Sequence, residues 1–162
     1  MKSMFPSREK VFKFGFTGTS EEVRTEQQKT LEKIIKKIAR KKEVEYHNGM
    51  CINSDEICFD LVARYIPHAD IVMHPPINKS KVFDLEDKTY VNRVIFRKDL
   101  DYLKRNMQIV AESNFLVATP KSVAEELRSG SWSTIRYARI ARIPIIIVWP
   151  NGSIRKEWPE KI

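Results

Sequence analysis

A run of small hydroxyl-bearing residues is the clearest place for chemistry in this sequence. It spans residues 128–134, Arg-Ser-Gly-Ser-Trp-Ser-Thr, and stands between an apolar strand-like segment and a helix-like one. The first turn of a helix has backbone N–H groups without internal acceptors and a positive partial charge. Such a turn suits phosphate or another anion. The sequence therefore predicts an anion site at this helix start.

The elements around this run alternate between short apolar strands and amphipathic helices. The strand-like segments are residues 11–16, 44–46, 70–74, 114–118 and 144–149. This alternation predicts an α/β fold, a three-layer Rossmann-like doubly wound parallel sheet of about five strands with both faces covered. Right-handed crossovers give the strand order 3-2-1-4-5. Ligands of such sheets bind at the carboxyl ends of the strands, where the order reverses.

The length favours a single domain over residues 1–162. Its core is expected at about 11–150. The irregular segment at about 76–97 is long for a connection in a compact domain, so it is expected to be a functional flap or a disordered segment, with a short strand at 90–96 left open. Residues 151–162 are expected to form a short basic C-terminal tail.

Small and polar residues follow the strands on the side where a ligand is expected. The predicted contacts are Thr17, Gly18, Thr19, His47, Asn48, Gly49, His74, Thr119, Gly130, Ser131, Trp132, Ser133 and Thr134. Thr19 and Glu22 have the spacing of a capping box, which would begin a helix just after the first strand. Trp132, His47 and His74 are expected to stack on a base or contact phosphate. The histidines have no paired ligand spacing, so no metal site is predicted.

The charge and the missing motifs narrow the function further. A net charge of +8, concentrated over residues 29–42, favours anionic partners and keeps single-stranded nucleic acid open as a partner. A G-x-G-x-x-G fingerprint and a P-loop are both absent, which argues against an NAD-dependent dehydrogenase and a P-loop NTPase. No apolar run is long enough to span a membrane, and Cys51 and Cys58 fit a reducing compartment. The expected location is cytoplasmic, with no membrane partner.

Four stretches together resemble the SLOG group of Rossmann-like proteins. They are Phe14–Thr19, His47–Asp55, Arg105–Pro120 and the 128–134 run. The group includes the DNA-processing protein A family, the cytokinin-activating phosphoribohydrolases and nucleotide-sensing domains of defence proteins. The resemblance covers about residues 11–150. It implies that Asp55, Arg105 and Asn106 also contact the ligand, and that the protein forms a homo-oligomer.

The resemblance breaks at the residue that matters for catalysis. In the phosphoribohydrolases a glutamate follows the loop threonine by three positions and works with the helix arginine on the N-glycosidic bond. Counting from Thr134 places Tyr137 there, and a tyrosine is a poor substitute for a carboxylate in this reaction. The catalytic residues therefore stay unassigned, with Asp55, Arg105 and Glu126 as candidates.

Three functions remain. The preferred interpretation is a module that binds a nucleotide or nucleotide-derived signal at the carboxyl ends of strands 1, 2 and 4, as a sensor or a sequestering protein without a cofactor or metal. The first alternative is an enzyme, a nucleoside-phosphate N-glycosidase or ribosyltransferase. The second alternative is a single-stranded DNA-binding protein.

Overall fold

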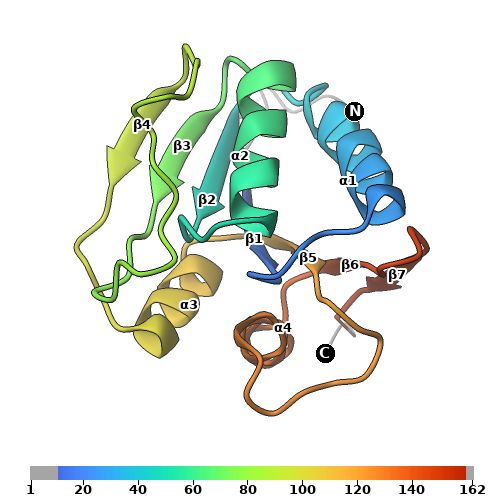
Figure 1. The fold of residues 1–162 in the computed structure, drawn as a ribbon. Coiled ribbons are helices and arrows are strands. Elements are labelled where there is room, and N and C mark those ends of the chain that lie inside the picture. Colours follow the sequence, from blue (N-terminus) through green and yellow to red (C-terminus); the bar gives the residue numbers. More distant parts are fainter. Residues whose placement is uncertain (1–10, 160–162) are drawn as a thin grey trace, which may run out of the picture.

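One mostly parallel sheet forms the centre of the structure. Its strands are β1 (Phe12–Gly18), β2 (Val44–Asn48), β3 (Asp70–Met73), β4 (Arg93–Phe96), β5 (Phe115–Thr119), β6 (Ile145–Val148) and β7 (Ile154–Glu157). The computed structural model describes residues 11–159, so the chain ends at 1–10 and 160–162, which include part of the expected tail, lie outside the described residues. The strand order is β4-β3-β2-β1-β5-β6-β7 (Figure 1).

Helices cover both faces of this sheet. They are α1 (Thr25–Ile38), α2 (Ser54–Tyr65), α3 (Tyr102–Ala111) and α4 (Gly130–Ala141). Helices α1 and α2 pack side by side on one face, and α3 and α4 pack together on the other (Figure 1). This is the predicted three-layer, doubly wound arrangement. Within the described residues, no helix is long and apolar enough to cross a bilayer.

The inner strands confirm the predicted order, and the sheet is larger than predicted. The expected strands 3-2-1-4-5 correspond to β3-β2-β1-β5-β6. Strand β4 adds to one edge within the expected flap. At the other edge β7 pairs antiparallel with β6, so part of the segment expected to be a tail is a strand. The residues of β7 are mostly exposed and polar, which is why apolar patterning did not reveal it.

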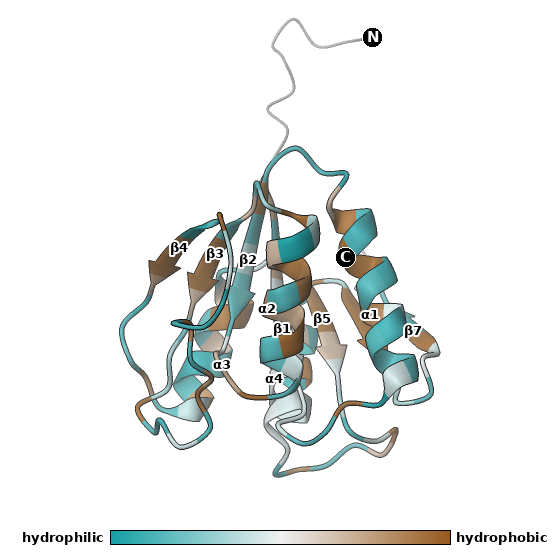
Figure 2. Ribbon diagram, turned by 45° about the horizontal axis from the view of Figure 1, so that its top comes forward, coloured by the Kyte–Doolittle hydropathy of each residue, from teal (hydrophilic) through white to brown (hydrophobic). Residues whose placement is uncertain are grey.

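Strand β1 lies at the centre of the sheet, between β2 and β5. Its residues 14–17 are all buried, because it pairs with β2 on one side and β5 on the other. Phe14 and Phe16 belong to the core under α1 and α2, whereas a second apolar cluster under α4 includes Leu116 and Ile135. Figure 2 shows hydrophobic colour on β3, β4 and β5, and helices that carry hydrophilic residues between hydrophobic ones. Both faces of the sheet are therefore covered by helices and pack through apolar side chains.

Helix α1 begins later than the capping-box pattern predicts. The Thr19 hydroxyl accepts a hydrogen bond from the Glu21 N–H at 3.0 Å, a local turn that threonine side chains often form with the backbone two residues on. The helix begins at Thr25, with Arg24 as N-cap and no side-chain cap. The prediction that Thr19 and Glu22 cap this helix is therefore wrong, and the α1 N-terminus borders a separate shallow hollow.

Gly18→Ala is expected to destabilise the protein by about 1–3 kcal/mol, the usual cost of overpacking a core. A Cβ at Gly18 would lie 2.3 Å from Ser54 Cβ and 2.3 Å from Thr119 Oγ1. Gly130→Ala is the matched control, because the nearest atom to its added Cβ is the Asn106 Nδ2 at 4.0 Å, and alanine is the better helix former. Urea unfolding of both variants measures the difference. Equal stabilities would contradict the close packing at Gly18.

Candidate functional site

A cavity of about 760 Å³ opens at the carboxyl ends of β1, β2 and β5. Its walls come from residues 16–21 at and after the end of β1, 49–55 after β2 and 78–81 in the flap. Residues 102–109 of α3 and residues 121–133, which run from the loop after β5 into the first turn of α4, complete them. Carboxyl ends of parallel strands meet at one edge of a sheet, which brings these distant segments together.

Most of the site residues predicted from the sequence line this cavity. They are Thr17, Gly18, Thr19, Gly49, Asp55, Arg105, Asn106, Gly130, Ser131 and Ser133. Of the three catalytic candidates, Asp55, Arg105 and Glu126 all line it as well.

The first turn of α4 forms one wall. Ser129 is the N-cap residue, and its Oγ accepts a hydrogen bond from the Trp132 N–H at 3.3 Å. The Thr134 hydroxyl donates to the Gly130 carbonyl oxygen at 2.9 Å. The cap uses one first-turn amide, so the amides of Gly130 and Ser131 remain for an anion in the cavity.

A buried arginine forms the floor. Arg105 is 7% exposed, and its Nε donates to Asn106 Oδ1 at 2.9 Å. Its Nη1 donates to the carbonyl oxygen of Gly49 and, at 3.4 Å, to that of His74. A Cβ on Gly49 would lie 2.7 Å from Arg105 Nη1 and 3.0 Å from Asp55 Oδ2. Only glycine lets the guanidinium and the carboxylate approach the loop this closely.

Asp55 is the one carboxyl in the cavity wall that is also buried. Its Oδ2 accepts a hydrogen bond from the Cys51 N–H at 3.0 Å. Burial raises the pKa of Asp55 to about 6, although the Arg105 charge and the Cys51 N–H pull it down. The group therefore exchanges a proton near neutral pH, which is a property that acid–base catalysts share.

Some of the basic side chains around the cavity are paired with carboxylates and others are not. Lys121 Nζ lies 3.0 Å from Glu21 Oε2 and 4.0 Å from Glu126 Oε2. Lys81 and Arg128 also line the cavity and are exposed, and among residues 11–159 neither forms an ion pair with a carboxylate. These two side chains are therefore available to a negatively charged ligand.

Six of the predicted contacts lie outside the cavity wall: His47, Asn48, His74, Thr119, Trp132 and Thr134. Trp132 is 4% exposed and packs on Trp149 with 6.1 Å between ring centroids, so its position does not support stacking on a base. Asn48 holds the loop after β2, since its Oδ1 accepts from the Met50 N–H at 2.6 Å.

The two histidines instead form a cluster of their own outside the cavity wall. His47 Nδ1 lies 2.8 Å from His74 Nε2, and both rings are fully buried. Burial lowers the pKa of His47, and it lowers that of His74 to about 4. Both rings are therefore neutral at physiological pH. The Glu112 carboxylate lies beside the pair.

Helix α4 contains no Asp or Glu, so it supplies no carboxylate to the cavity. Tyr137 does not line it and packs against the apolar cluster under α4. Because the helix begins at Gly130, Ser131 is the first hydroxyl of the turn that lines the cavity. Counting three positions from Ser131 leads to Thr134, which is buried. Either count places a residue without a carboxylate where the phosphoribohydrolases carry glutamate.

Sequence reasoning missed two parts of the wall. The flap contributes Asn78, Ser80 and Lys81, and α3 contributes Tyr102 and Leu103. The flap residues carried a signal, since an irregular polar segment of that length pointed to a functional loop. Tyr102 and Leu103 lie on the first turn of α3, next to Arg105, and their exposure was not evident from the helical pattern.

The chain has a Rossmann-like α/β fold, which solved structures of similar shape share. The molybdenum cofactor binding protein from the phototrophic bacterium Rippkaea orientalis is 18% identical, with a TM-score of 0.62 over 86% of this chain and 77% of that one. No protein-family model matches the sequence, and neither does any curated protein.

Two DNA processing proteins share the fold as well. DNA processing protein A from Streptococcus pneumoniae is 17% identical, with a TM-score of 0.60 over 85% of this chain and 50% of that one. The same protein from Helicobacter pylori, described for its single-stranded DNA binding mode, is 16% identical, with a TM-score of 0.56 over 84% of this chain and 64% of that one. At sequence identities this low, the structural similarity establishes the fold alone.

Asp55→Asn is expected to gain stability relative to the wild type as the pH rises. The pKa of Asp55 is about 6 in the folded protein and 3.8 for an ordinary aspartate. The stabilising contribution of the protonated carboxyl is therefore present at low pH and is lost as the pH rises through 6. The full difference is on the order of 3 kcal/mol. Urea unfolding of both proteins between about pH 4 and pH 7 measures it, and a difference that stays flat over that range would contradict the assignment.

Proposed function

We propose that the protein binds a nucleotide or nucleotide-derived molecule in this cavity, as a sensor or a sequestering module. The observation that carries the proposal is one cavity lined by the first turn of α4, by Lys81 and by Arg128. Unpaired amides at a helix N-terminus, together with cations, suit a phosphate group. The Lys121 ammonium lies in the same wall, already paired with acidic side chains.

The remaining walls support a base and a ribose. The Tyr102 ring lines the cavity, with the Arg105 guanidinium 5.5 Å from its centroid. An exposed aromatic ring is a surface on which a base can stack. The Asn106 amide and the Ser80 hydroxyl supply donors and acceptors at the same cavity. Binding of this kind needs neither a cofactor nor a metal ion.

Lys81→Ala and Arg128→Ala are each expected to weaken nucleotide binding by about 10- to 100-fold. A hydrogen bond to a charged group contributes about 1.5–3 kcal/mol, and each 1.4 kcal/mol is a factor of ten. Lys33→Ala is the matched control, since it removes an exposed lysine of α1 that does not line the cavity. Calorimetric titration with mono-, di- and cyclic nucleotides gives the affinities, after mass spectrometry of small molecules carried by the purified protein has narrowed the panel.

The proposal fails if no nucleotide in the panel binds the wild type and no nucleotide-like molecule accompanies the purified protein. Elemental analysis for molybdenum adds a second arm, because one protein of similar fold binds the molybdenum cofactor. Molybdenum at stoichiometric amounts would assign the cavity to that cofactor in place of a free nucleotide.

Hydrolysis of an N-glycosidic bond is the second candidate, and Asp55 is the observation that favours it. This carboxyl is buried in the cavity wall with a pKa of about 6, so it can donate or accept a proton near neutral pH. Chromatography of nucleoside monophosphates incubated with the protein tests the reaction. Free base that appears with the wild type and disappears with Asp55→Asn would assign catalysis to this site.

Single-stranded DNA is the third candidate ligand, since a DNA processing protein of the same fold binds it. The lysines of α1 do not line the cavity, so a strand held by them would need a second surface. Oligonucleotide affinity that falls steeply with salt and drops in Lys33→Ala would favour this function.

We also propose a homo-oligomer. Leu103, Met107 and Leu127 are 57%, 51% and 86% exposed, and large exposed apolar side chains favour an interface when they gather on one surface. Light scattering after size-exclusion chromatography checks this, and the monomer mass of 19.0 kDa would contradict it.

A further inference from the structure

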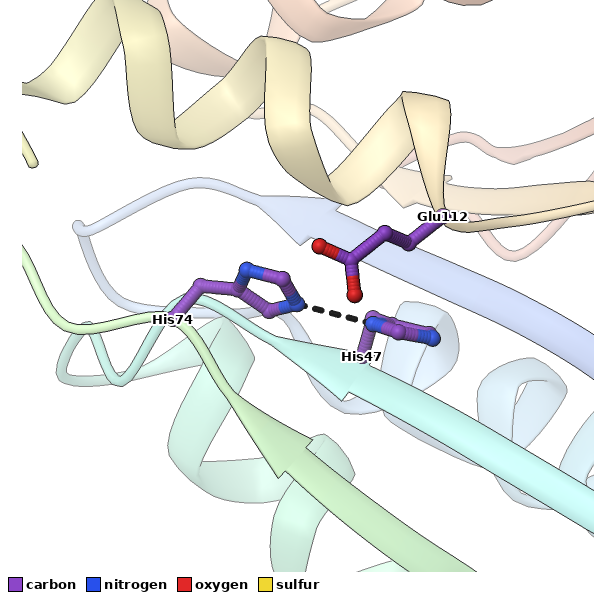
Figure 3. Close-up of side chains that lie close together, drawn as sticks. All are labelled: His47, His74 and Glu112. Atoms are coloured by element: carbon purple, nitrogen blue, oxygen red, sulfur yellow. Dashed lines mark hydrogen bonds between the residues drawn. The ribbon is translucent and has the colours of Figure 1, made fainter. Parts of the chain in front are cut away.

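Two buried histidines from adjacent strands face each other with a carboxylate beside them. His47 lies in β2, His74 directly follows β3, and Glu112 directly follows α3 (Figure 3). The His47 Nδ1 and His74 Nε2 atoms are 2.8 Å apart. One ligand atom from each of the three side chains lies within 4.8 Å of the other two. This cluster is separate from the cavity proposed to hold the nucleotide.

The outer nitrogen of each ring faces an acceptor. His47 Nε2 lies 2.8 Å from Glu45 Oε2, and His74 Nδ1 lies 2.7 Å from Gln108 Oε1. Carboxylate and amide oxygens only accept hydrogen bonds, so both outer nitrogens carry the hydrogen. A neutral imidazole has a single N–H. With the Gln108 oxygen turned to the ring and one N–H on each imidazole, the two inner nitrogens turn their lone pairs toward each other.

Two facing lone pairs at this distance repel, and a cation between them removes the repulsion. The charged side chains around the pair are Glu45, Glu112 and Arg97. Two carboxylates and one guanidinium leave a net negative charge beside the rings. A net negative charge beside buried side chains is costly unless a positive charge compensates it.

We propose that His47, His74 and Glu112 bind a divalent transition-metal cation of the Zn²⁺ type. Zn²⁺ takes imidazole nitrogen and carboxylate oxygen as ligands, and tetrahedral coordination places two nitrogens roughly 3.3 Å apart. The inner nitrogens need to separate by only about half an ångström to reach that spacing.

The surroundings have the pattern of a metal site rather than of a simple histidine pair. Metal-bound histidines usually donate their other N–H to a carboxylate or carbonyl oxygen, as Glu45 and Gln108 accept here. Among residues 11–159, the Arg97 guanidinium reaches Glu112 at Oε1, through Nε at 2.8 Å and Nη2 at 2.7 Å, and no bond to the other carboxylate oxygen is formed. The second oxygen of Glu112 is thus left for the metal.

The site would also position the nucleotide cavity. Arg105, Gln108 and Glu112 follow one another along the same side of α3 at helical spacing. Arg105 lines the cavity, while the other two contact the histidine pair. A metal bound to Glu112 and both histidines would fasten α3 to the ends of β2 and β3, and the Arg105 guanidinium with it.

Elemental analysis of the purified protein, with any affinity tag removed, is the first test. We expect about one zinc per chain, loss of that zinc to a strong chelator, and recovery with added ZnCl₂. The thermal midpoint should fall on chelation and return with the metal, because a ligand of the native state stabilises it. The proposal would be overturned if the wild-type protein retains no zinc and added ZnCl₂ does not change its thermal midpoint. A Gln108 amide turned to present its Nε2, or a proton shared by the rings, would give that result.

Variants of the ligands assign the metal to this cluster. His47→Gln and His74→Gln should abolish zinc retention, and Glu45→Gln should weaken it by roughly 10- to 100-fold, the usual effect of removing an outer partner. Glu112→Gln retains shape at a half-buried position, so it serves if a histidine variant does not fold.

Two substitutions control for adventitious binding. His68→Gln removes an exposed histidine that contacts the Lys41 carbonyl, and Cys51→Ser removes the thiol in the cavity wall. Both variants should retain zinc as the wild type does. Zinc that persists in all the ligand variants, or is lost in either control, would overturn the assignment.

Discussion

The need to compensate one buried positive charge organises the floor of the cavity. Arg105 is almost wholly removed from solvent, and an unpaired guanidinium in that position would be very costly. Its hydrogen bonds to Gly49, His74 and Asn106 meet the requirement, with the Asp55 carboxylate close by. The loop after β2, the end of β3 and the first turn of α2 must therefore keep fixed positions relative to α3. The shape of the cavity follows from that requirement.

The parts of this arrangement that could be predicted are those with local sequence signals. Buried parallel strands are continuously apolar, so β1, β2, β3, β5 and β6 were each visible in the sequence, and crossover handedness ordered them. Gly18, Gly49 and Gly130 marked the loops around the cavity, and at Gly18 and Gly49 the close approach of neighbouring side chains leaves no room for a Cβ. The general position of the site followed from those two facts.

The parts that could not be predicted depend on pairing between distant residues. His47 and His74 are 27 positions apart, and only the β2–β3 register, with Asn48 opposite Met73, makes them neighbours. Spacing rules for metal ligands describe residues on one helix or one loop, so they do not detect such a pair. Trp132 illustrates the opposite error. A tryptophan at a helix start has the same local signature whether it faces a ligand or, as here, packs on Trp149.

Segment 121–129, the cavity wall after β5, is held by exposed ion pairs, whereas the floor is held by the buried hydrogen bonds of Arg105. Lys121 contacts Glu21 and Glu126, and Glu125 contacts Arg136 and Arg139, all through side chains that solvent reaches. Such pairs contribute little and weaken with salt. Segment 121–129 is therefore the wall that can yield at small cost, while the floor under Arg105 stays in place. Entry and exit of a ligand would pass through this side, so ionic strength would change the rates of exchange even where it leaves the bound complex unaltered.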